Sequence, residues 1–379
     1  MKGLIPTAGL GTRMFPLTLT RPKTLLPVLG KPILHYVLQV FNRIGIKEIG
    51  IIVNATHRKS IESYVSSHYE HMINFIEQNK ALGLAHAILT AKDFINNESC
   101  LIINGDAILE GNWHALIESH HRMNAKTTLG LCRVPRPERF GVVKLQGHRV
   151  IKVIEKPKKP FSPLASASTY LIEPSVLNFF ERIRLGERGE YDFADAIQLL
   201  IGENEFVMGY ELDNWIDIGH PWDYLDANLY LLQSISKEID DSVRIGRGTD
   251  IQNSFIDRDC EIAENCRILH SFIDKNVTIN SSSVIERSVV LSSTKIGENV
   301  VIKNSVIGGN CIIGNSVRFL DKKDNNQEIY TCFEEKLVNT HRNRLGSFIA
   351  DNVTVNENQV IPPGSIYSYE KNHAKDSTL

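Results

Sequence analysis

Two glycines, an arginine and a lysine near the start of the chain have the types and spacing of a phosphate-binding loop. Gly9 and Gly11 follow the predicted strand Lys2–Thr7 and precede Arg13 and Lys23. Because glycine has no Cβ, the backbone can approach a phosphate there, and cationic side chains would add charge-assisted hydrogen bonds. The Gly-Lys-Ser/Thr of a P-loop is absent, and a purely structural turn explains the glycines alone equally well.

Asp106 is a second candidate because it closes an apolar run. The run Cys100–Asp106 is predicted to be a strand, so the carboxylate would stand at the carboxyl edge of a parallel sheet, where such sheets bind ligands. An aspartate at this position is as often the N-cap of the next helix. The residues alone leave both roles open.

The run from Gly9 to Val28 resembles a family signature. It matches the pattern G-x-G-T-R…P-K…L-P of the nucleotidyl transferase family, typified by glucose-1-phosphate thymidylyltransferases and uridylyltransferases. The resemblance implies that Arg13 and Lys23 are catalytic residues that bind and polarise a nucleoside triphosphate. It also implies a set of nucleotide-binding residues around them: Ala8, Gly9, Gly11 and Thr12.

The same resemblance implies a divalent metal site. Asp106 matches the family's metal-binding aspartate, and Trp215–Gly219 resembles its second metal motif, in which Asp217 is the matching residue. Two carboxylates and phosphate oxygens suit Mg²⁺, which keeps several waters and rarely has an all-protein cage. Mg²⁺ is therefore the expected cofactor.

Gln78 and Gly83 are the expected base-binding residues. They match a glutamine and a glycine with which the family reads a pyrimidine edge, and a glutamine amide can both donate and accept, as uracil or thymine requires. The resemblance thus favours UTP or dTTP. His86, on the following predicted helix, is expected to pack rather than to do chemistry, because no second candidate ligand is near it in the sequence.

Two segments resemble the part of the family site that binds a sugar 1-phosphate. Gly141 is expected to hydrogen-bond the sugar through its backbone. Glu155 is expected to accept from sugar hydroxyls, and Lys156 to hold the sugar phosphate. Taken alone, Glu155 and Lys156 would be better explained as a solvated turn before a proline.

One departure from the family bears on the sugar. Where the family commonly has Gly-Ile-Tyr, this chain has Ser168–Tyr170, so the side chain of Thr169 would face the sugar. A glucose-like sugar is expected, and its identity stays open. The segment Glu190–Asp192 resembles a further family segment that contacts the sugar.

These residues must be positioned by alternating strands and helices. The predicted strands are Lys2–Thr7, Ile49–Asn54, Ile73–Gln78 and Cys100–Asp106. The predicted helices are Ile33–Gly45, Ile61–Ser67 and Leu84–Phe94. This order indicates an α/β fold with a Rossmann-like, mostly parallel sheet.

From Ser242 onward, aliphatic residues recur every 17 positions. Three registers share this step: Ile245, Ile262, Ile279, Ile296, Ile313; Ile251, Ile268, Ile285, Ile302; and Ile256, Ile273, Val290, Ile307. Three inward residues per turn predict a triangular parallel β-solenoid, and the region resembles a left-handed β-helix of hexapeptide repeats. An ordinary sandwich with accidental periodicity would not be expected to hold these registers over four turns.

Two domains are therefore expected. A nucleotidyltransferase catalytic domain would comprise residues 1–235, and a left-handed β-helix domain would comprise residues 242–369. Residues 316–344 interrupt the period with polar sequence, so an inserted loop is expected there. A helix over Trp222–Ile239 is expected to link the domains.

The reaction that the resemblance implies joins a sugar 1-phosphate to UTP or dTTP, releases pyrophosphate and makes a nucleoside-diphosphate sugar. One alternative is a bifunctional enzyme with an acyltransferase in the solenoid. Lys303 and Val306 stand where such enzymes carry a His and a Tyr, so His270 or His341 would have to act as the base. The other alternative is a non-catalytic regulatory relative that binds sugar nucleotide, which the retained cationic and acidic residues disfavour.

Composition excludes several function classes. With 42 Lys and Arg against 44 Asp and Glu, no overall positive field exists to hold nucleic acid or an anionic membrane. No apolar run has the length of a membrane span or signal peptide, and the six scattered cysteines lack Cys-x-x-Cys spacing. A cytoplasmic protein is expected, and related solenoids favour a homo-oligomer, with a trimer as one form.

Overall fold

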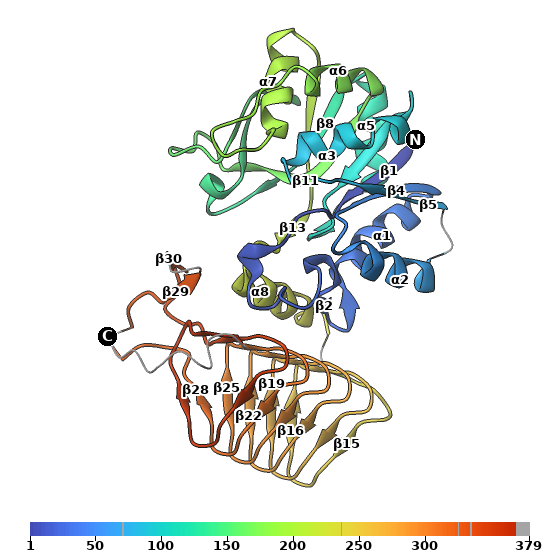
Figure 1. The fold of residues 1–379 in the computed structure, drawn as a ribbon. Helices are drawn as coiled ribbons and strands as arrows, with labels where there is room; N and C mark the ends of the chain where they lie inside the picture. The colour runs from blue at the N-terminus through green and yellow to red at the C-terminus, as the bar shows by residue number, and fades with distance from the viewer. Residues whose placement is uncertain (70–71, 236, 325, 334–335, 369–379) are drawn as a thin grey trace. The chain divides into compact units, whose positions relative to one another are not determined.

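The computed structural model describes residues 1–69, 72–235, 237–324, 326–333 and 336–368 (Figure 1). Its contacts divide the chain into two compact units. The sheet unit comprises Met1–Leu10 and Ile33–Asp217, and the coil unit comprises Gly11–Pro32 and the chain from Ile218 onward. The loop after the first strand therefore groups with the C-terminal part of the chain. No helix in the described ranges is long and apolar enough to cross a membrane.

The sheet unit is built on a nine-stranded sheet. Its strands are, in spatial order, β5 (Met72–Glu77), β4 (Glu48–Val53), β1 (Lys2–Pro6), β6 (Cys100–Ile103), β11 (Leu164–Ile172), β8 (Thr127–Arg133), β12 (Val207–Glu211), β10 (Arg149–Glu155) and β9 (Gly141–Gln146). The first four strands are parallel, as predicted.

The other half of the sheet is mixed, which corrects the expectation of a mostly parallel sheet. Strand β11 runs antiparallel to both β6 and β8, and β9 runs antiparallel to β10. Only Gly147 and His148 separate β9 from β10, and so short a connection can join only antiparallel strands. The predicted β–α alternation covers the N-terminal strands and does not extend over these hairpins.

The helices of the sheet unit are α1 (Ile33–Arg43), α2 (Arg58–His68), α3 (Leu84–Thr90), α4 (Lys92–Ile95), α5 (Trp113–Arg122), α6 (Leu177–Phe180) and α7 (Phe193–Gly202), with short 3₁₀ turns η3 (Pro137–Arg139) and η4 (Pro174–Val176). Helices α1 and α2 correspond to the predicted helices Ile33–Gly45 and Ile61–Ser67. The predicted helix Leu84–Phe94 is interrupted at Ala91, which leaves the helical conformation. Leu4, Ile88 and Ile102 belong to a fully buried core, in which each such side chain contributes roughly 1.5–3 kcal/mol.

A separate two-stranded ribbon lies beside the carboxyl end of β6. Strand β7 (Ala107–Glu110) pairs antiparallel with β13 (Asn214–Asp217). The predicted strand Cys100–Asp106 is longer than the observed strand β6, which ends at Ile103. Asn104 N–H donates to Ser168 O at 3.0 Å, and Gly105 N–H donates to Pro6 O at 3.1 Å.

The coil unit contains three parallel sheets whose short strands are stacked turn upon turn (Figure 1). The first consists of β14 (Glu238–Ile239), β17 (Phe255–Ile256), β20 (Phe272–Ile273), β23 (Val289–Val290), β26 (Val306–Ile307), β31 (Phe348–Ile349) and β34 (Ile366–Tyr367). The second consists of β15 (Arg244–Ile245), β18 (Glu261–Ile262), β21 (Thr278–Ile279), β24 (Lys295–Ile296), β27 (Ile312–Ile313) and β32 (Thr354–Val355). The third consists of β16 (Asp250–Gln252), β19 (Arg267–Leu269), β22 (Val284–Glu286), β25 (Val301–Lys303), β28 (Arg318–Phe319) and β33 (Val360–Ile361).

The three predicted registers are the three inward positions of these sheets. Their residues are buried, except for Ile245 in the first turn, which is 45% exposed. A serine one turn below accepts from each serine N–H of the first sheet, as in Ser271 N–H to Ser254 Oγ and Ser288 N–H to Ser271 Oγ, both 3.1 Å. The stacked parallel sheets therefore fit a β-helix.

The chain between the halves differs from the prediction. Helix α8 spans Pro221–Leu232, and Glu238–Ile239 is a strand, so the predicted helix Trp222–Ile239 is too long. Ile239 precedes Ile256 by one 17-residue step and is already part of the first turn. The interruption after β28 carries the hairpin β29 (Tyr330–Phe333) and β30 (Lys336–Asn339). Position 369, the predicted domain end, lies outside the described residues.

Candidate active site

Asp106 and Asp217 are brought to neighbouring positions by the small ribbon. Asp106 immediately precedes β7, and Asp217 is the last residue of β13. Asp217 pairs with Ala107, so the two aspartates, more than a hundred residues apart in sequence, lie next to one another across the ribbon. Sequence reasoning could name the two residues but could not predict this pairing.

Tyr170 is a buried residue of β11 that interacts electrostatically with both aspartates. The side chain is only 6% exposed, and burial raises the pKa of its hydroxyl well above the ordinary value. The carboxylates of Glu155, Asp106 and Asp217 raise this pKa further. Asp106 and Asp217, neighbours through the ribbon, offer the oxygen donors that a divalent metal accepts, so these residues fit such an ion.

Buried polar atoms with no hydrogen-bond partner among the described residues lie on the strands around these carboxylates. They include Asn104 Oδ1, Thr169 Oγ1 and Trp215 Nε1. Thr169 pairs with Ile103 at the end of β6. An unsatisfied buried group costs about 1–3 kcal/mol, and such groups are expected where a ligand completes the hydrogen bonding.

The predicted sugar-side residues are adjacent on β9 and β10. Gly141 pairs with Glu155, and a Cβ at position 141 would lie 3.0 Å from Glu155 Oε2, so glycine leaves room for that carboxylate. Lys156 Nζ lies 3.6 Å from Glu155 Oε1. Burial raises the pKa of Glu155, and the cation of Lys156 acts against this rise.

Arg188 is a member of this cluster that sequence reasoning missed. Its Nη1 lies 3.7 Å from Glu155 Oε1, and it also pairs with Asp192. The available signal was its position four residues before Asp192, two residues ahead of the segment Glu190–Asp192 that resembled a sugar-contacting one. The cluster therefore has two cations facing one half-buried carboxylate.

The backbone at Ser168 explains part of the departure from Gly-Ile-Tyr. Ser168 has φ +52°, in the left-handed region that favours glycine, within an irregular part of the β11–β8 pairing. Ser168 O accepts from Asn104 N–H, and Thr169 beside it is fully buried. The serine thus keeps a glycine-like backbone and adds a side chain.

Gln78 is held by a histidine that was expected only to pack. Gln78 is 5% exposed, and its Nε2 donates to His86 Nδ1 at 2.8 Å. The His86 ring stacks on Tyr191, with centroids 6.3 Å apart. Gly83 has φ +94°, and a Cβ there would lie 2.8 Å from Tyr191 O, so this position requires glycine.

The predicted phosphate-binding residues have contrasting exposure. Ala8 is buried and its carbonyl accepts from Asn54 Nδ2 at 2.8 Å, whereas the following Gly9 is exposed. These two residues belong to the sheet unit.

The other predicted phosphate-binding residues belong to the coil unit. Gly11 has φ +68°, and its carbonyl accepts from Thr18 Oγ1 at 2.8 Å, which closes a tight turn before η1 (Thr12–Met14). Thr12 and Arg13 are exposed in that turn. Lys23, at the start of η2 (Lys23–Leu25), is 9% exposed.

Comparison with known proteins identifies the family. Residues 2–234 match the family model "Nucleotidyl transferase". The chain belongs to the nucleotidyl transferase family. This confirms the resemblance found in the loop signature. Residues 250–373 of this nucleotidyl transferase match the model "GMPPB C-terminal domain".

Similar proteins carry several names. "Bifunctional protein GlmU" of Methanococcus maripaludis is 37% identical over 63% of this chain and 56% of its own length. The chain thus spans about half the length of the GlmU relatives that it matches. "Low-salt glycan biosynthesis nucleotidyltransferase Agl11" of Haloferax volcanii is 34% identical over 70% of this chain and 73% of its own.

Two thymidylyltransferases are also similar. "Glucose-1-phosphate thymidylyltransferase" of Streptomyces griseus is 31% identical over 76% of this chain and 85% of its own. The crystal structure of a putative glucose-1-phosphate thymidylyltransferase from Bacillus anthracis, in complex with a sucrose, has a TM-score of 0.57 at 28% identity and covers 61% of this chain and 94% of that chain.

A buried aspartate of the coil unit binds the loop Gly11–Pro32, which carries predicted phosphate-binding residues. Asp351, 7% exposed, accepts from Thr20 Oγ1 and from the Arg21 guanidinium. Its other oxygen accepts from Gly309 N–H at 2.6 Å. The loop that carries Lys23 is therefore fastened to the stacked sheets.

Helix α8 fastens the same loop at a second point. The Tyr224 hydroxyl donates to Pro27 O, in β2 (Pro27–Val28), which pairs with β3 (Lys31–Pro32). Leu29 N–H donates to Asn228 Oδ1 at 3.2 Å. The helix is in turn joined to the inserted segment, where Arg342 Nη1 donates to Asp226 Oδ1 at 2.9 Å.

Proposed function

We propose that this nucleotidyl transferase is a sugar-1-phosphate nucleotidyltransferase that makes a UDP- or dTDP-sugar and pyrophosphate. The observation that carries the proposal is the β7–β13 pairing, because it sets Asp217 opposite Ala107, the residue that follows Asp106. The family membership supports the same reaction.

The proposed reaction needs no covalent nucleophile. An oxygen of the sugar phosphate would attack the α-phosphorus in line, forming one P–O bond while the bond to the leaving pyrophosphate breaks. Arg13 and Lys23 would hold the triphosphate, and Lys156 would hold the sugar phosphate. Catalysis would come from positioning and from neutralising charge.

The carboxylate pair fits Mg²⁺. Asp106 and Asp217 would be its protein ligands, and the ion would supply neutralisation of phosphate charge when bound. The unpartnered Asn104 Oδ1 beside Asp106 adds an oxygen acceptor that a hydrated ion could satisfy through water.

The nucleotide and sugar choices rest on different residues. We infer a pyrimidine nucleotide from Gln78, whose amide is oriented by His86, while Ala8, Gly9, Gly11, Thr12 and Gly83 would contact the nucleotide through loop backbone. A glucose-like sugar is supported by Gly141 and Glu155 and by the name of the Streptomyces griseus relative. The buried Thr169 hydroxyl would face the sugar.

The test is a pyrophosphate-release screen of sugar 1-phosphates against UTP, dTTP, ATP and GTP at equal concentration. We expect turnover with UTP or dTTP well above turnover with the purine nucleotides. A purine preference would overturn the role of Gln78. Absence of turnover with every pair would favour the non-catalytic, regulatory alternative.

We also infer the domain organisation and assembly. A catalytic domain over 1–235 and a left-handed β-helix domain over 242–369, with an inserted loop at 316–344, are supported by the 17-residue pairing of the three sheets. Such a coil would assemble a homo-oligomer, with a trimer as the form to test. Light scattering on the purified chain that gives a monomer mass would contradict this inference.

An acyltransferase in the coil unit is the second candidate, because the similar GlmU proteins are named bifunctional. His270 lines a cavity of about 380 Å³ together with Arg287, which gives a potential base a space for substrate. Against it, Lys303 pairs with Glu286 at 3.0 Å and Val306 is fully buried. Release of CoA from acetyl-CoA that depends on an amino-sugar phosphate would favour this candidate.

A further inference from the structure

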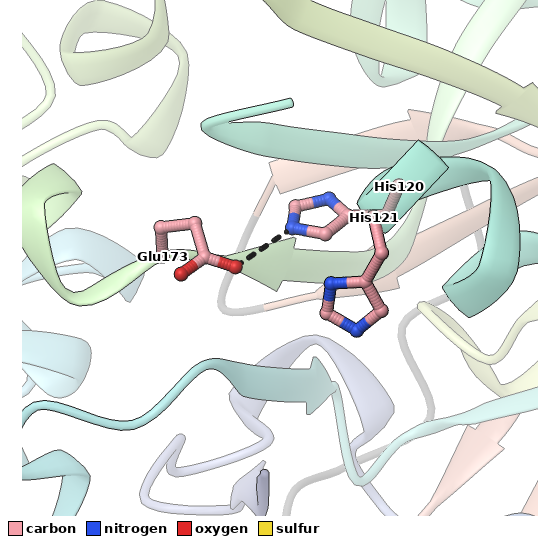
Figure 2. Close-up of side chains that lie close together, drawn as sticks. All are labelled: His120, His121 and Glu173. Atoms are coloured by element: carbon pink, nitrogen blue, oxygen red, sulfur yellow. Dashed lines mark hydrogen bonds and ion pairs between the residues drawn. The ribbon is translucent and has the colours of Figure 1, made fainter. Parts of the chain in front are cut away.

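A cluster of two histidines and a glutamate lies beside the nine-stranded sheet, where β11 ends and β6 begins. His120 and His121 are in the last turn of α5, and Glu173 directly follows β11 (Figure 2). Ile172 of β11 pairs with Cys100 at the start of β6, whereas Asp106 follows the end of β6. The cluster is thus separated from the proposed magnesium site by the length of a strand.

The three side chains converge. One ligand atom from each lies within 4.8 Å of the others, and His120 Nε2 is 3.0 Å from Glu173 Oε1 (Figure 2). His120 is 1% exposed, and Glu173 is partly exposed. His121 is exposed, so its ring can rotate and the cluster can be reached from solvent.

Two hydroxyl groups orient the buried part of the cluster. Thr128 Oγ1 lies 2.7 Å from His120 Nδ1, and Ser99 Oγ donates to Glu173 Oε1 at 3.0 Å. If His120 Nδ1–H donates to Thr128, its Nε2 lone pair faces a carboxylate oxygen, and two acceptors at that distance need a proton or a metal ion between them. Hydrogen bonds of this kind, from the second nitrogen of a histidine, are typical behind metal ligands.

We propose that His120, His121 and Glu173 bind a zinc-type divalent ion, with the fourth position open to water. Two imidazoles and one carboxylate are a donor set that zinc accepts, and three protein ligands plus water give it four-coordination. Bonds of about 2.0–2.1 Å require the ligand atoms to draw closer than their present spread, which rotation of His121 permits. The ion would fasten the end of α5 to the residue after β11.

The competing explanation is a structural hydrogen bond. In that case His120 Nε2–H donates to Glu173, the Thr128 hydroxyl donates to Nδ1, and His121 has no part. The two explanations differ in what His121 does, so His121 decides between them.

The test uses the untagged full-length chain, with Mg²⁺ present and nucleotide absent. Calorimetric titration with ZnCl₂ and thermal unfolding with and without ZnCl₂ are measured for the wild type, His121→Ala, Glu173→Gln and His114→Ala. His114 is an exposed histidine of the same helix outside the cluster, and it serves as the matched control.

We expect zinc to bind once per chain and to raise the thermal midpoint of the wild type and of His114→Ala. Affinity should fall at least about tenfold in His121→Ala and in Glu173→Gln. Because His121 is exposed, His121→Ala should keep the zinc-free midpoint, so loss of binding cannot be misfolding. Co²⁺ bound in place of zinc should give the absorption of a tetrahedral site. Unchanged zinc affinity in His121→Ala, or no stabilisation of the wild type, would overturn the proposal.

Discussion

At the scale of single residues, the candidate site contains positions where a close neighbour leaves no space for a side chain. Gly141 lacks a side chain where Glu155 takes the space, and Gly83 lacks one where the Tyr191 carbonyl approaches. The Gln78 amide is oriented by its hydrogen bond to His86. The types of these residues were predictable from sequence, but their mutual constraints are contacts between separate elements.

Replacing Asp106 or Asp217 by Asn should remove metal-dependent turnover. The change keeps size and most hydrogen bonding but removes one negative charge from a shared ion, so turnover should fall by orders of magnitude while folding survives. Turnover and thermal midpoint are measured for both single variants and the double variant. The losses should be non-additive, because both residues act on one ion. A near-normal rate in either single variant would remove that residue from the metal site.

Replacing His86 by Ala should weaken nucleotide binding without removing chemistry. The Gln78 amide loses a hydrogen bond of about 0.5–1.5 kcal/mol, so KM for UTP or dTTP should rise roughly two- to twelvefold with little change in kcat. Initial rates over a range of nucleotide concentration measure this. His68→Ala, at an exposed position of α2, is the control and should leave KM unchanged. An unaltered KM in His86→Ala would mean that His86 does not position Gln78.

At the scale of elements, the stacked sheets depend on hydrogen bonds that repeat with the period. Each serine of the first sheet accepts from the serine N–H one turn further along, which satisfies a buried donor at a corner. This gives the Ser-x-Ile pattern of the sequence a physical cause.

Replacing Ser288 by Ala should therefore destabilise the coil unit. Ser288 is fully buried, and its Oγ accepts from Ser305 N–H at 3.2 Å, so the variant leaves a buried donor unsatisfied at a cost of about 1–3 kcal/mol. Thermal unfolding measures the loss. Ser281→Ala, at a partly exposed position outside the ladder, should have little effect. Equal midpoints for the two variants would show that the ladder contributes no stability.

At the scale of the whole molecule, the loop Gly11–Pro32 belongs to the unit that contains the stacked sheets. Asp351 and α8 bind the segment Gly11–Pro32, so the coil unit holds a loop that carries Lys23.

Replacing Asp351 by Asn should loosen this loop. The Arg21 cation loses its charged partner in a mostly buried place, which costs about 1–3 kcal/mol. Hydrogen exchange over residues 11–32 should speed up, and KM for the triphosphate should rise. The control is Asp250→Asn, which changes only a hydrogen bond to Gln252 within one strand and should change neither quantity. Unchanged exchange in Asp351→Asn would contradict the anchoring role.

The sequence by itself determined much about this protein wherever the information is local. The 17-residue registers, the first parallel strands and the loop signature each depend on residues close together in the chain, so period and type suffice to predict them. The mixed half of the sheet was not predicted, since antiparallel pairing depends on which distant strand lies beside β11.

Only the tertiary structure decided the contacts between distant segments. Three such contacts join residues from separate parts of the chain. They are the pairing of Asp217 with Ala107, the ion pair of Arg188 with Glu155 and the ion pair of Arg21 with Asp351. No local pattern encodes such contacts, because each depends on how several elements pack at once. The His120–Glu173 contact could not be predicted for the same reason, because it depends on the end of α5 packing beside the end of β11.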